Sequence, residues 1–200
     1  MAPTLSQRKR AAIVQAAIEE FHISGYNCSN MDAIAARAKV SKRTVYNHFS
    51  SKEALFGEIS MQLCESITNV VPEKFDAAVP LRDQLIIYAE RKIALCTCPE
   101  FVVMAKVTLP ERVRNPELAK DAFERIRSGD TGFDRWLESA MDEGMINRTC
   151  PLDLRRQFSA LLLEFVFWPQ FFGVDPMPTK KESKEIAATT VDIFLNGCAS

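Results

Sequence analysis

Side chains with the chemistry to bind DNA are concentrated in residues 42–48, which read Lys-Arg-Thr-Val-Tyr-Asn-His. In the major groove, Arg or Lys pairs with guanine and Asn pairs with adenine. Three side chains of the segment are therefore able to read base edges: Lys42, Arg43 and Asn47. We favour Arg43 for this role. Three others suit phosphate oxygens: Thr44, Tyr46 and His48.

Such a segment needs an apolar inner side that holds it against a core. Val45 and Phe49 are four positions apart, so they share one face of a helix and are expected to point inward. Ser41 is a natural cap for this helix, and Asn30 is placed to cap another short helix predicted at 31–38. Only two residues separate that second helix from Ser41. Two short helices joined by so tight a turn predict a helix-turn-helix.

The remaining sequence also reads as helical. Apolar residues recur at helical spacing over residues 5–23, and a capping box at Ser50 or Ser51 starts a fourth helix that continues to Pro72. Further helices are expected at about 80–96, 99–109, 116–143 with a possible break at 128–130, 153–172 and 180–196. We found no recurring strand-like alternation and no internal repeat. The sequence therefore predicts an all-α protein whose first three helices form a small domain at residues 1–52, with a larger helical domain at 53–200.

Charge is distributed unevenly between these two parts. Residues 1–52 carry eight Lys/Arg and three Asp/Glu, a net charge of +5, whereas the rest carries 17 basic and 23 acidic residues, a net charge of −6. Positive charge gathered at one end suits a domain held against a polyanion. Charge alone does not distinguish DNA from an acidic protein partner.

Several other classes are disfavoured. The start of the chain lacks the apolar stretch of a secretory signal, and the most apolar segment, 157–174, contains Glu164 and Pro169 and is short for a membrane span. We expect a cytoplasmic protein with no membrane partner. No Gly-rich phosphate loop, HExxH or GxSxG motif occurs, and both histidines, His22 and His48, fall in the first domain. We therefore expect no enzyme activity and no cofactor.

The six cysteines include no CxxC pair, which disfavours a zinc site. Reduced and mostly buried thiols are the expected state. The spacing of Cys96 and Cys98 leaves open a thiol-based or metal sensor.

The first domain closely resembles the TetR/AcrR family of bacterial regulators. Apolar, capping, aromatic and basic positions match in register over 25–35, 40–49 and 51–56. The resemblance implies an all-helical protein with a three-helix DNA-binding head and a divergent ligand-binding body. It also implies that the last two helices pair with those of a second copy. One departure is Lys39, where the family usually has glycine in a left-handed turn position.

The resemblance adds phosphate contacts to the predicted interface. Ser29 and Asn30 match a family contact at the start of the second helix, and Lys52 stands at a helix start where its charge adds to free backbone amides. The candidate DNA-binding residues are thus Ser29, Asn30, Ser41, Lys42, Arg43, Thr44, Tyr46, Asn47, His48 and Lys52. Simpler roles stay open. The serines and Asn30 could act only as caps, and the ring of Tyr46 could simply cover the core. His48 could be an ordinary interior or surface histidine, and the lysines and Arg43 could be solvated charges.

Two sites are expected in the larger domain. A helix over 158–172 that is apolar nearly all round, together with a stripe on the last helix, would form a four-helix dimer interface. The predicted interface residues are Phe158, Leu162, Ile186, Thr190, Ile193 and Phe194. The predicted walls of a pocket for an apolar or amphiphilic effector are Phe101, Met104, Phe133, Trp136, Glu164, Phe165 and Trp168, with Gln170 as a further polar group. Both sets could instead be core residues of one subunit.

The sequence therefore predicts a homodimeric repressor that binds a pseudo-palindromic DNA operator and is released by a small effector. Activation by the effector is the less common behaviour in the family and stays open. The alternative from another class is a helical effector-binding or scaffold protein without specific DNA binding. Salt-dependent binding to its own upstream DNA would separate the two.

Overall fold

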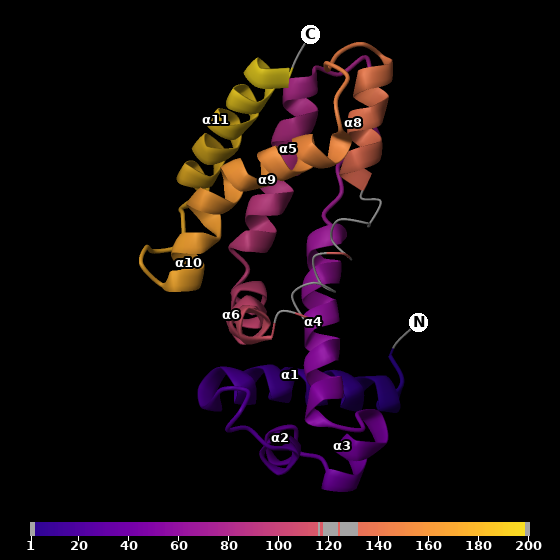
Figure 1. Ribbon diagram of the computed structural model, residues 1–200, viewed down its shortest axis with the longest axis vertical. Helices are drawn as coiled ribbons and strands as arrows, with labels where there is room; N and C mark the ends of the chain where they lie inside the picture. The colour runs from indigo at the N-terminus through magenta and orange to yellow at the C-terminus, as the bar shows by residue number, and fades with distance from the viewer. Residues whose placement is uncertain (1–2, 116, 118–123, 125–131, 199–200) are drawn as a thin grey trace. The chain divides into compact units, whose positions relative to one another are not determined.

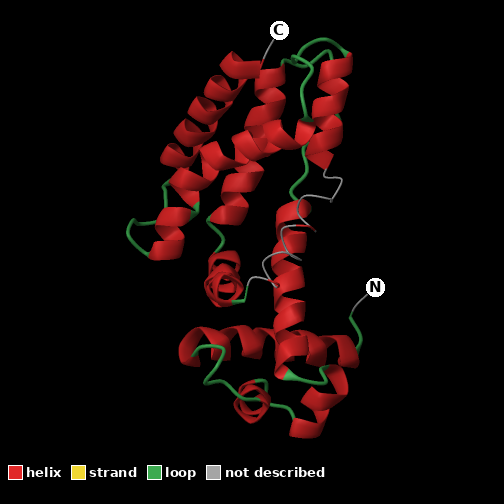
Figure 2. Ribbon diagram, viewed as in Figure 1, coloured by secondary structure: helices red, strands yellow, loops and turns green. Residues whose placement is uncertain are grey.

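The computed structural model describes residues 3–115, 117, 124 and 132–198. These residues form helices joined by loops and contain no strand (Figures 1 and 2). The helices are α1 (Leu5–Ser24), α2 (Met31–Arg37), α3 (Lys42–His48), α4 (Lys52–Thr68), α5 (Leu81–Cys96), α6 (Pro99–Arg114), α8 (Gly132–Asp142), α9 (Pro151–Val166), α10 (Trp168–Phe172) and α11 (Lys180–Cys198). The predicted all-α fold is confirmed.

The chain divides into two compact units. The first, here called the head unit, comprises the described residues within 1–64 and 103–123, and the second, the body unit, comprises those within 65–102 and 124–200. The head unit therefore contains α1, α2, α3, most of α4 and the C-terminal part of α6. The predicted boundary at residue 52 separates a DNA-binding domain from an effector-binding and dimerisation domain. It is a prediction about function, and the two compact units do not test it.

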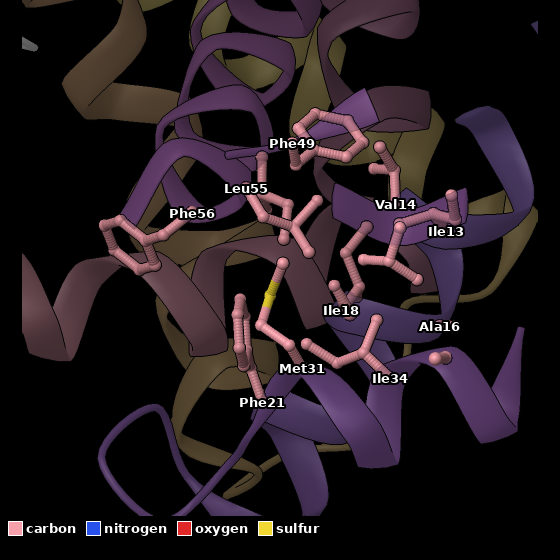
Figure 3. Close-up of a cluster of buried hydrophobic side chains, with 14 of the residues drawn as sticks. Ile13, Val14, Ala16, Ile18, Phe21, Met31, Ile34, Phe49, Leu55 and Phe56 are labelled. Carbon is pink, nitrogen blue, oxygen red and sulfur yellow. The ribbon is translucent and has the colours of Figure 1, made fainter. Parts of the chain in front are cut away.

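The core of the head unit is a cluster of apolar side chains from α1 to α4 (Figure 3). Ile13, Ile34, Val45, Leu55 and Ile59 are fully buried in it. Val107 of α6 belongs to the same cluster. Burying a side chain of this size contributes about 1.5–3 kcal/mol, so these residues fix the mutual positions of α1, α2, α3 and the start of α4.

Local capping sets where the head helices begin. The Asn30 side chain accepts hydrogen bonds from the backbone N–H groups of Asp32 and Ala33, and the Ser41 hydroxyl accepts one from that of Thr44. Ser51 accepts one from the N–H of Ala54 at the start of α4. Each bond satisfies an amide that the first turn of a helix leaves without an intrahelical partner. The starts predicted from these residues are confirmed.

The turn between α2 and α3 has the left-handed backbone that glycine usually supplies. Lys39 has φ 54°, the only positive φ at a non-glycine residue in the described part of the chain. The N–H of Val40 bonds the carbonyl of Ala35 at 3.1 Å, so the helix ends in a Schellman-type turn. The chain therefore keeps the turn expected from the family resemblance despite the lysine.

Replacing Lys39 with glycine should raise the free energy of unfolding by about 1 kcal/mol, because the side chain disfavours this left-handed conformation. Urea denaturation measures the change. Lys39→Ala is the matched control, since it removes the charge and keeps the Cβ atom. Equal stabilities for the Gly and Ala variants would show that the backbone is not strained there.

Prolines account for most differences from the predicted helix ends. α4 stops at Thr68 instead of Pro72, because the residue before a proline disfavours helix and two valines precede it. The predicted helix over 153–172 is interrupted at Phe167 between α9 and α10, where Pro169 supplies no N–H. The predicted break at 128–130 lies outside the described residues.

The prediction that the sixth helix ends at residue 109 is wrong. α6 continues through Pro110 to Arg114. A proline inside a helix costs about 3 kcal/mol. Anchors on both sides offset that cost: Val107 is buried in the head core, and the buried Arg112 donates to the Ser60 carbonyl at 3.4 Å.

The body unit is built from α5, α8, α9, α10 and α11. Aromatic rings of three helices pack together in its interior: Tyr88 of α5, Phe133 of α8 and Phe158 of α9. A bidentate pair between Arg82 and Asp192 joins α5 to α11. In the described part of the chain, no single helix is both long and apolar enough to cross a membrane, although α5 and α6 taken together satisfy the length and composition required.

Candidate nucleic-acid interface

α3 has one buried face and one exposed face. Val45 is 0% exposed and Phe49 at the end of the helix is also buried, so both hold α3 against the head core. Arg43 and Asn47 are exposed on α3, and Tyr46 is 45% exposed. This is the arrangement predicted from the sequence, with apolar residues inward and polar ones toward solvent.

Arg43 is the most available cation on this face. Within the described residues its guanidinium has no ion pair or hydrogen bond, whereas the Lys42 ammonium lies 2.8 Å from a carboxylate oxygen of Asp32. That hydrogen bond raises the pKa of Lys42. Both partners are exposed, so the pair contributes little to stability. Arg43 can therefore reach a base without first giving up a protein contact.

The predicted phosphate-binding residues differ in their exposure and in the hydrogen bonds that they already form within the protein. Thr44 and His48 are partly exposed, and the Thr44 hydroxyl lies 2.8 Å from that of Ser41. Asn30 is exposed and its side-chain oxygen caps α2. Ser29 is only 5% exposed, and its hydroxyl donates to the carbonyl of Tyr26 at 2.7 Å. The Ser29 hydroxyl is thus already engaged within the protein, and its backbone N–H also donates to the carbonyl of Gly25 at 3.2 Å.

The Lys52 ammonium is directed into the loop between α1 and α2. It donates to the carbonyls of Tyr26 at 2.7 Å, Ser29 at 3.1 Å and Asn27 at 3.4 Å. It also lies 4.5 Å from the centroid of the Tyr26 ring, a cation–π contact. An ammonium has three donors, and all three are used here. A phosphate contact would require Lys52 to release a carbonyl, so we expect a positioning role in which Lys52 orders the start of α2.

Lys52→Met should lower the free energy of unfolding by about 1–2 kcal/mol, because it leaves loop carbonyls without their charged donor. The change is measured by urea denaturation. The salt dependence of DNA binding should stay close to that of the unmodified protein. Lys42→Met is the matched control and should change stability little. Unchanged stability with a salt slope flattened by about one would instead identify Lys52 as a phosphate contact.

Two ion pairs that join helices within the head unit were not predicted from the sequence. Arg10 forms a bidentate pair with Glu58, with atoms 2.7 and 2.9 Å apart, and its guanidinium lies 4.9 Å from the centroid of the Phe49 ring. This pairing lowers the pKa of Glu58. Arg37 donates to the buried Glu20 at 2.9 Å. The partners are distant in sequence, so helical spacing carried no signal for them.

The predicted pocket residues do not converge on one cavity. Phe101, Phe133 and Trp136 are buried in the body unit, whereas Met104 packs against the core of the head unit. The other three reach the surface of the body unit: Glu164 is exposed, Phe165 is 59% exposed and Trp168 is 38% exposed. Gln170 is buried and its amide donates to the carbonyl of Pro176.

An apolar groove of about 650 Å³ runs between α9 and α11 of the body unit, two helices that pack side by side (Figure 1). Its lining residues are Gln157, Ala160, Leu161, Glu164, Phe165, Ile193, Phe194, Gly197 and Cys198.

The predicted dimer residues lie at different depths near this groove. Ile193 is 53% exposed and Ile186 is partly exposed. The other four have almost no exposed surface: Phe158, Leu162, Thr190 and Phe194. Those four side chains pack into the core of their own subunit.

None of the six cysteines, all of which lie within the described residues, forms a disulfide. Cys96 is buried, which raises the pKa of its thiol to about 11, and Cys98 donates to a carboxylate oxygen of Glu100 at 2.9 Å. The described residues contain no group of three or more His, Cys, Asp or Glu side chains arranged to hold a metal ion.

Two family models match the chain. The model described as "Bacterial regulatory proteins, tetR family" matches residues 13–59, and "AefR-like transcriptional repressor, C-terminal domain" matches residues 83–197. The second match alone covers more than half of the chain.

The chain is also similar to individual regulators, which supports these family matches. The chain is 26% identical to the HTH-type transcriptional regulator AcrR of Shigella flexneri, over 95% of this chain and 91% of AcrR. It is similar to the crystal structure of a TetR family transcriptional regulator from Pseudomonas syringae pv. tomato, with 36% identity, 96% coverage of both chains and a TM-score of 0.85. It is also similar to the flavonoid-responsive regulator FrrA, with 26% identity, 96% and 97% coverage and a TM-score of 0.74.

Proposed function

This chain belongs to the TetR/AcrR family of transcriptional regulators, a non-enzyme class with a helix-turn-helix DNA-binding domain, and from that premise we propose that it is a homodimeric repressor released by a small effector. The repressor role is supported by the C-terminal family model, which is described as that of a repressor and covers residues 83–197. The DNA partner makes the cytoplasm the proposed location.

The observation that carries the DNA-binding proposal is the exposed face of α3. Arg43 stands on it with no ion pair or hydrogen bond to any described residue, while the buried Val45 and Phe49 hold the helix against the head core. In our proposal, α3 enters the major groove, where Arg43 reads guanine and Lys42 and Asn47 assist. The proposed phosphate contacts are Ser29, Asn30, Ser41, Thr44, Tyr46 and His48. Residues 1–52 thus form the proposed DNA-binding domain, and 53–200 the proposed effector and dimerisation domain.

The groove between α9 and α11 is the proposed dimer interface. Large apolar side chains stand exposed beside it, with Phe165 on α9 and Ile193 on α11. Ala160 and Gly197 line the same groove, and such small residues allow helices of a second copy to approach closely. The same two helices from each copy would form a self-complementary four-helix interface.

The proposed release from DNA follows from the geometry of a dimer that carries two DNA-binding domains. A dimer fits a pseudo-palindromic operator only when its recognition helices are separated by roughly 34 Å or a multiple of that distance. An effector that favours another separation weakens DNA binding by the same coupling free energy with which DNA weakens effector binding. FrrA, which is named as flavonoid-responsive, supports a small molecule as the signal here.

Binding to its own upstream DNA, titrated at several salt concentrations, tests the proposed function. We expect affinity for one upstream segment to exceed that for unrelated duplex by at least about 10³-fold, with affinity for both falling as salt rises. A scaffold protein would fold normally and show no such binding. Absence of binding at low ionic strength would therefore refute the proposal.

A further inference from the structure

Exposed apolar side chains are gathered on and just after the short helix α10 of the body unit. They are Trp168, 38% exposed, Phe172, 67%, Val174, 70%, and Met177, 43%, and we call these four residues the α10 patch. The rings of Trp168 and Phe172 stack with their centroids 6.0 Å apart. Figure 1 shows α10 and the loop that follows it between the end of α9 and the start of α11. Large exposed side chains concentrated in one short segment mark an interaction surface.

Hydrogen bonds hold the loop of this segment against α10. The N–H of Val174 donates to the carbonyl of Pro169 at 3.0 Å, and the buried side-chain amide of Gln170 donates to the carbonyl of Pro176 at 3.0 Å. Gly173 has φ 68°, the left-handed conformation that ends α10. The α10 patch is therefore presented by an ordered backbone, so little conformational entropy is lost when it binds.

The large apolar side chains exposed at the groove between α9 and α11 are too few for a stable dimer. They are Phe165, 59% exposed, and Ile193, 53% exposed. A fully exposed aromatic side chain presents about 150–250 Å², so these two residues offer on the order of 200 Å², and adding the α10 patch raises the total to roughly 500 Å². A standard interface buries about 800 Å² per partner, of which about 65% is apolar at its core. The α10 patch thus supplies the apolar area that a stable dimer needs.

The groove must also be filled when a second copy covers it. Its volume is about 650 Å³, and the small residues Ala160 and Gly197 are among those that line it. Interfaces pack as densely as protein interiors at their core, so a void of this size is not tolerated. Outside the groove and the α10 patch, the exposed large apolar side chains among the described residues of the body unit are Val71, Val79 and Ile87. None of these is aromatic, whereas the α10 patch provides two rings.

Charge also favours the segment that carries the α10 patch as the occupant of the groove. Glu164 lines the groove and is exposed, and its carboxylate forms no ion pair or hydrogen bond with any described residue. The ammonium of Lys180, at the start of α11, is likewise exposed and has no such partner. A carboxylate that an apolar surface covers needs a cation nearby. The chain brings one to the end of this segment.

We propose that the α10 patch of each copy seats in the groove between α9 and α11 of the other copy. The inference rests on the proposed homodimer and names the segment that completes its interface. A two-fold axis makes the contact twice, with Phe172 of each copy against Ala160 of the partner subunit. The groove of one subunit is thus incomplete without its partner, and α10 joins α9 and α11 as a third interface helix of each copy.

Disulfide cross-linking of mixed chains tests this contact, because a disulfide requires Cα atoms within about 7 Å of each other. The exposed Cys28 and Cys150 are first replaced by serine in the full-length protein. One chain then carries Ala160→Cys and the other Phe172→Cys, and the two are mixed, allowed to exchange subunits and oxidised with diamide. We expect several-fold more cross-linked dimer in the mixture than in either chain alone. Ile87→Cys in place of Phe172→Cys is the matched control and should give no such increase.

Sedimentation analysis tests the contribution of the α10 patch to dimer affinity. Phe172→Ala should raise the dissociation constant of the dimer by about tenfold or more, because a few aromatic residues carry most of the binding energy of an interface. The subunit should keep its helix content by circular dichroism, since the Phe172 side chain is exposed. Ile87→Ala removes another exposed apolar side chain from the same unit and should leave the dissociation constant unchanged.

Three results would overturn the inference. The first is a cross-link that Phe172→Cys chains form equally well alone, which would place the two α10 patches against each other. The second is the absence of a cross-link in mixed chains that sediment as dimers, and the third is an unchanged dissociation constant in Phe172→Ala. Each of these leaves the proposed homodimer standing. An unmodified protein that sediments as a monomer at every concentration refutes the proposed homodimer instead.

Discussion

Ile193→Glu should convert the proposed dimer into a monomer and lower affinity for the operator by more than about 100-fold, because one head then binds where two did. Ile193 is 53% exposed at the groove between α9 and α11. In a two-fold interface the substitution places two carboxylates close together and away from water. Burying unpaired charge is strongly unfavourable, so the interface should not form.

Sedimentation analysis and operator titration measure the two effects. Ile87→Glu is the matched control, since Ile87 is an exposed isoleucine on α5 of the same unit. It should leave the dimer intact. Phe194 is a poorer test, because it is buried and packs on Phe158, so a charge there would damage the subunit itself. A dimer that persists in Ile193→Glu would show that the interface lies elsewhere.

Arg43→Ala should weaken specific binding by about 1–3 kcal/mol, or roughly 5- to 150-fold, if Arg43 pairs with a guanine through two hydrogen bonds. The loss should be smaller for unrelated DNA, because phosphate contacts supply most non-specific affinity. Base preference at one position in each half-site should relax. Titration against a set of single-base operator variants measures all three effects.

Arg8→Ala is the control for the loss of one positive charge. Arg8 is exposed on α1 and belongs to the same basic head. Its substitution should lower affinity for all sequences by a similar factor and leave the ranking of operator variants unchanged. An unchanged ranking in Arg43→Ala would contradict the base-reading role.

Features set by neighbouring residues could be predicted from the sequence. The bounds of α3 are those expected from the Ser41 cap and the apolar pair Val45 and Phe49. The match to a family glycine position pointed to a left-handed turn at Lys39 and left open whether the lysine keeps it, and the structure has that turn, with φ 54°. These features depend on contacts within a few residues, and spacing along the chain reports such contacts directly.

Features set by distant contacts could not be predicted. The Lys52 ammonium reaches carbonyls more than twenty residues away, and Arg112 stabilises α6 beyond Pro110 through the distant Ser60 carbonyl. The apolar pattern of 158–172 showed that this segment is covered on several sides. It did not show which side chains meet their own subunit, as Phe158 and Leu162 do. Periodicity identifies a buried face without identifying the surface that covers it.

Methylation interference on the upstream DNA most directly tests the claim that α3 reads the major groove. The method methylates guanine at N7, a major-groove atom. We expect interference at two clusters of guanines, one per half-site, whose centres are about 10 base pairs or a multiple of that apart. Arg43→Ala should remove interference at one guanine in each cluster. Tight binding without any interference at guanine N7, or interference that is identical in Arg43→Ala, would contradict that claim.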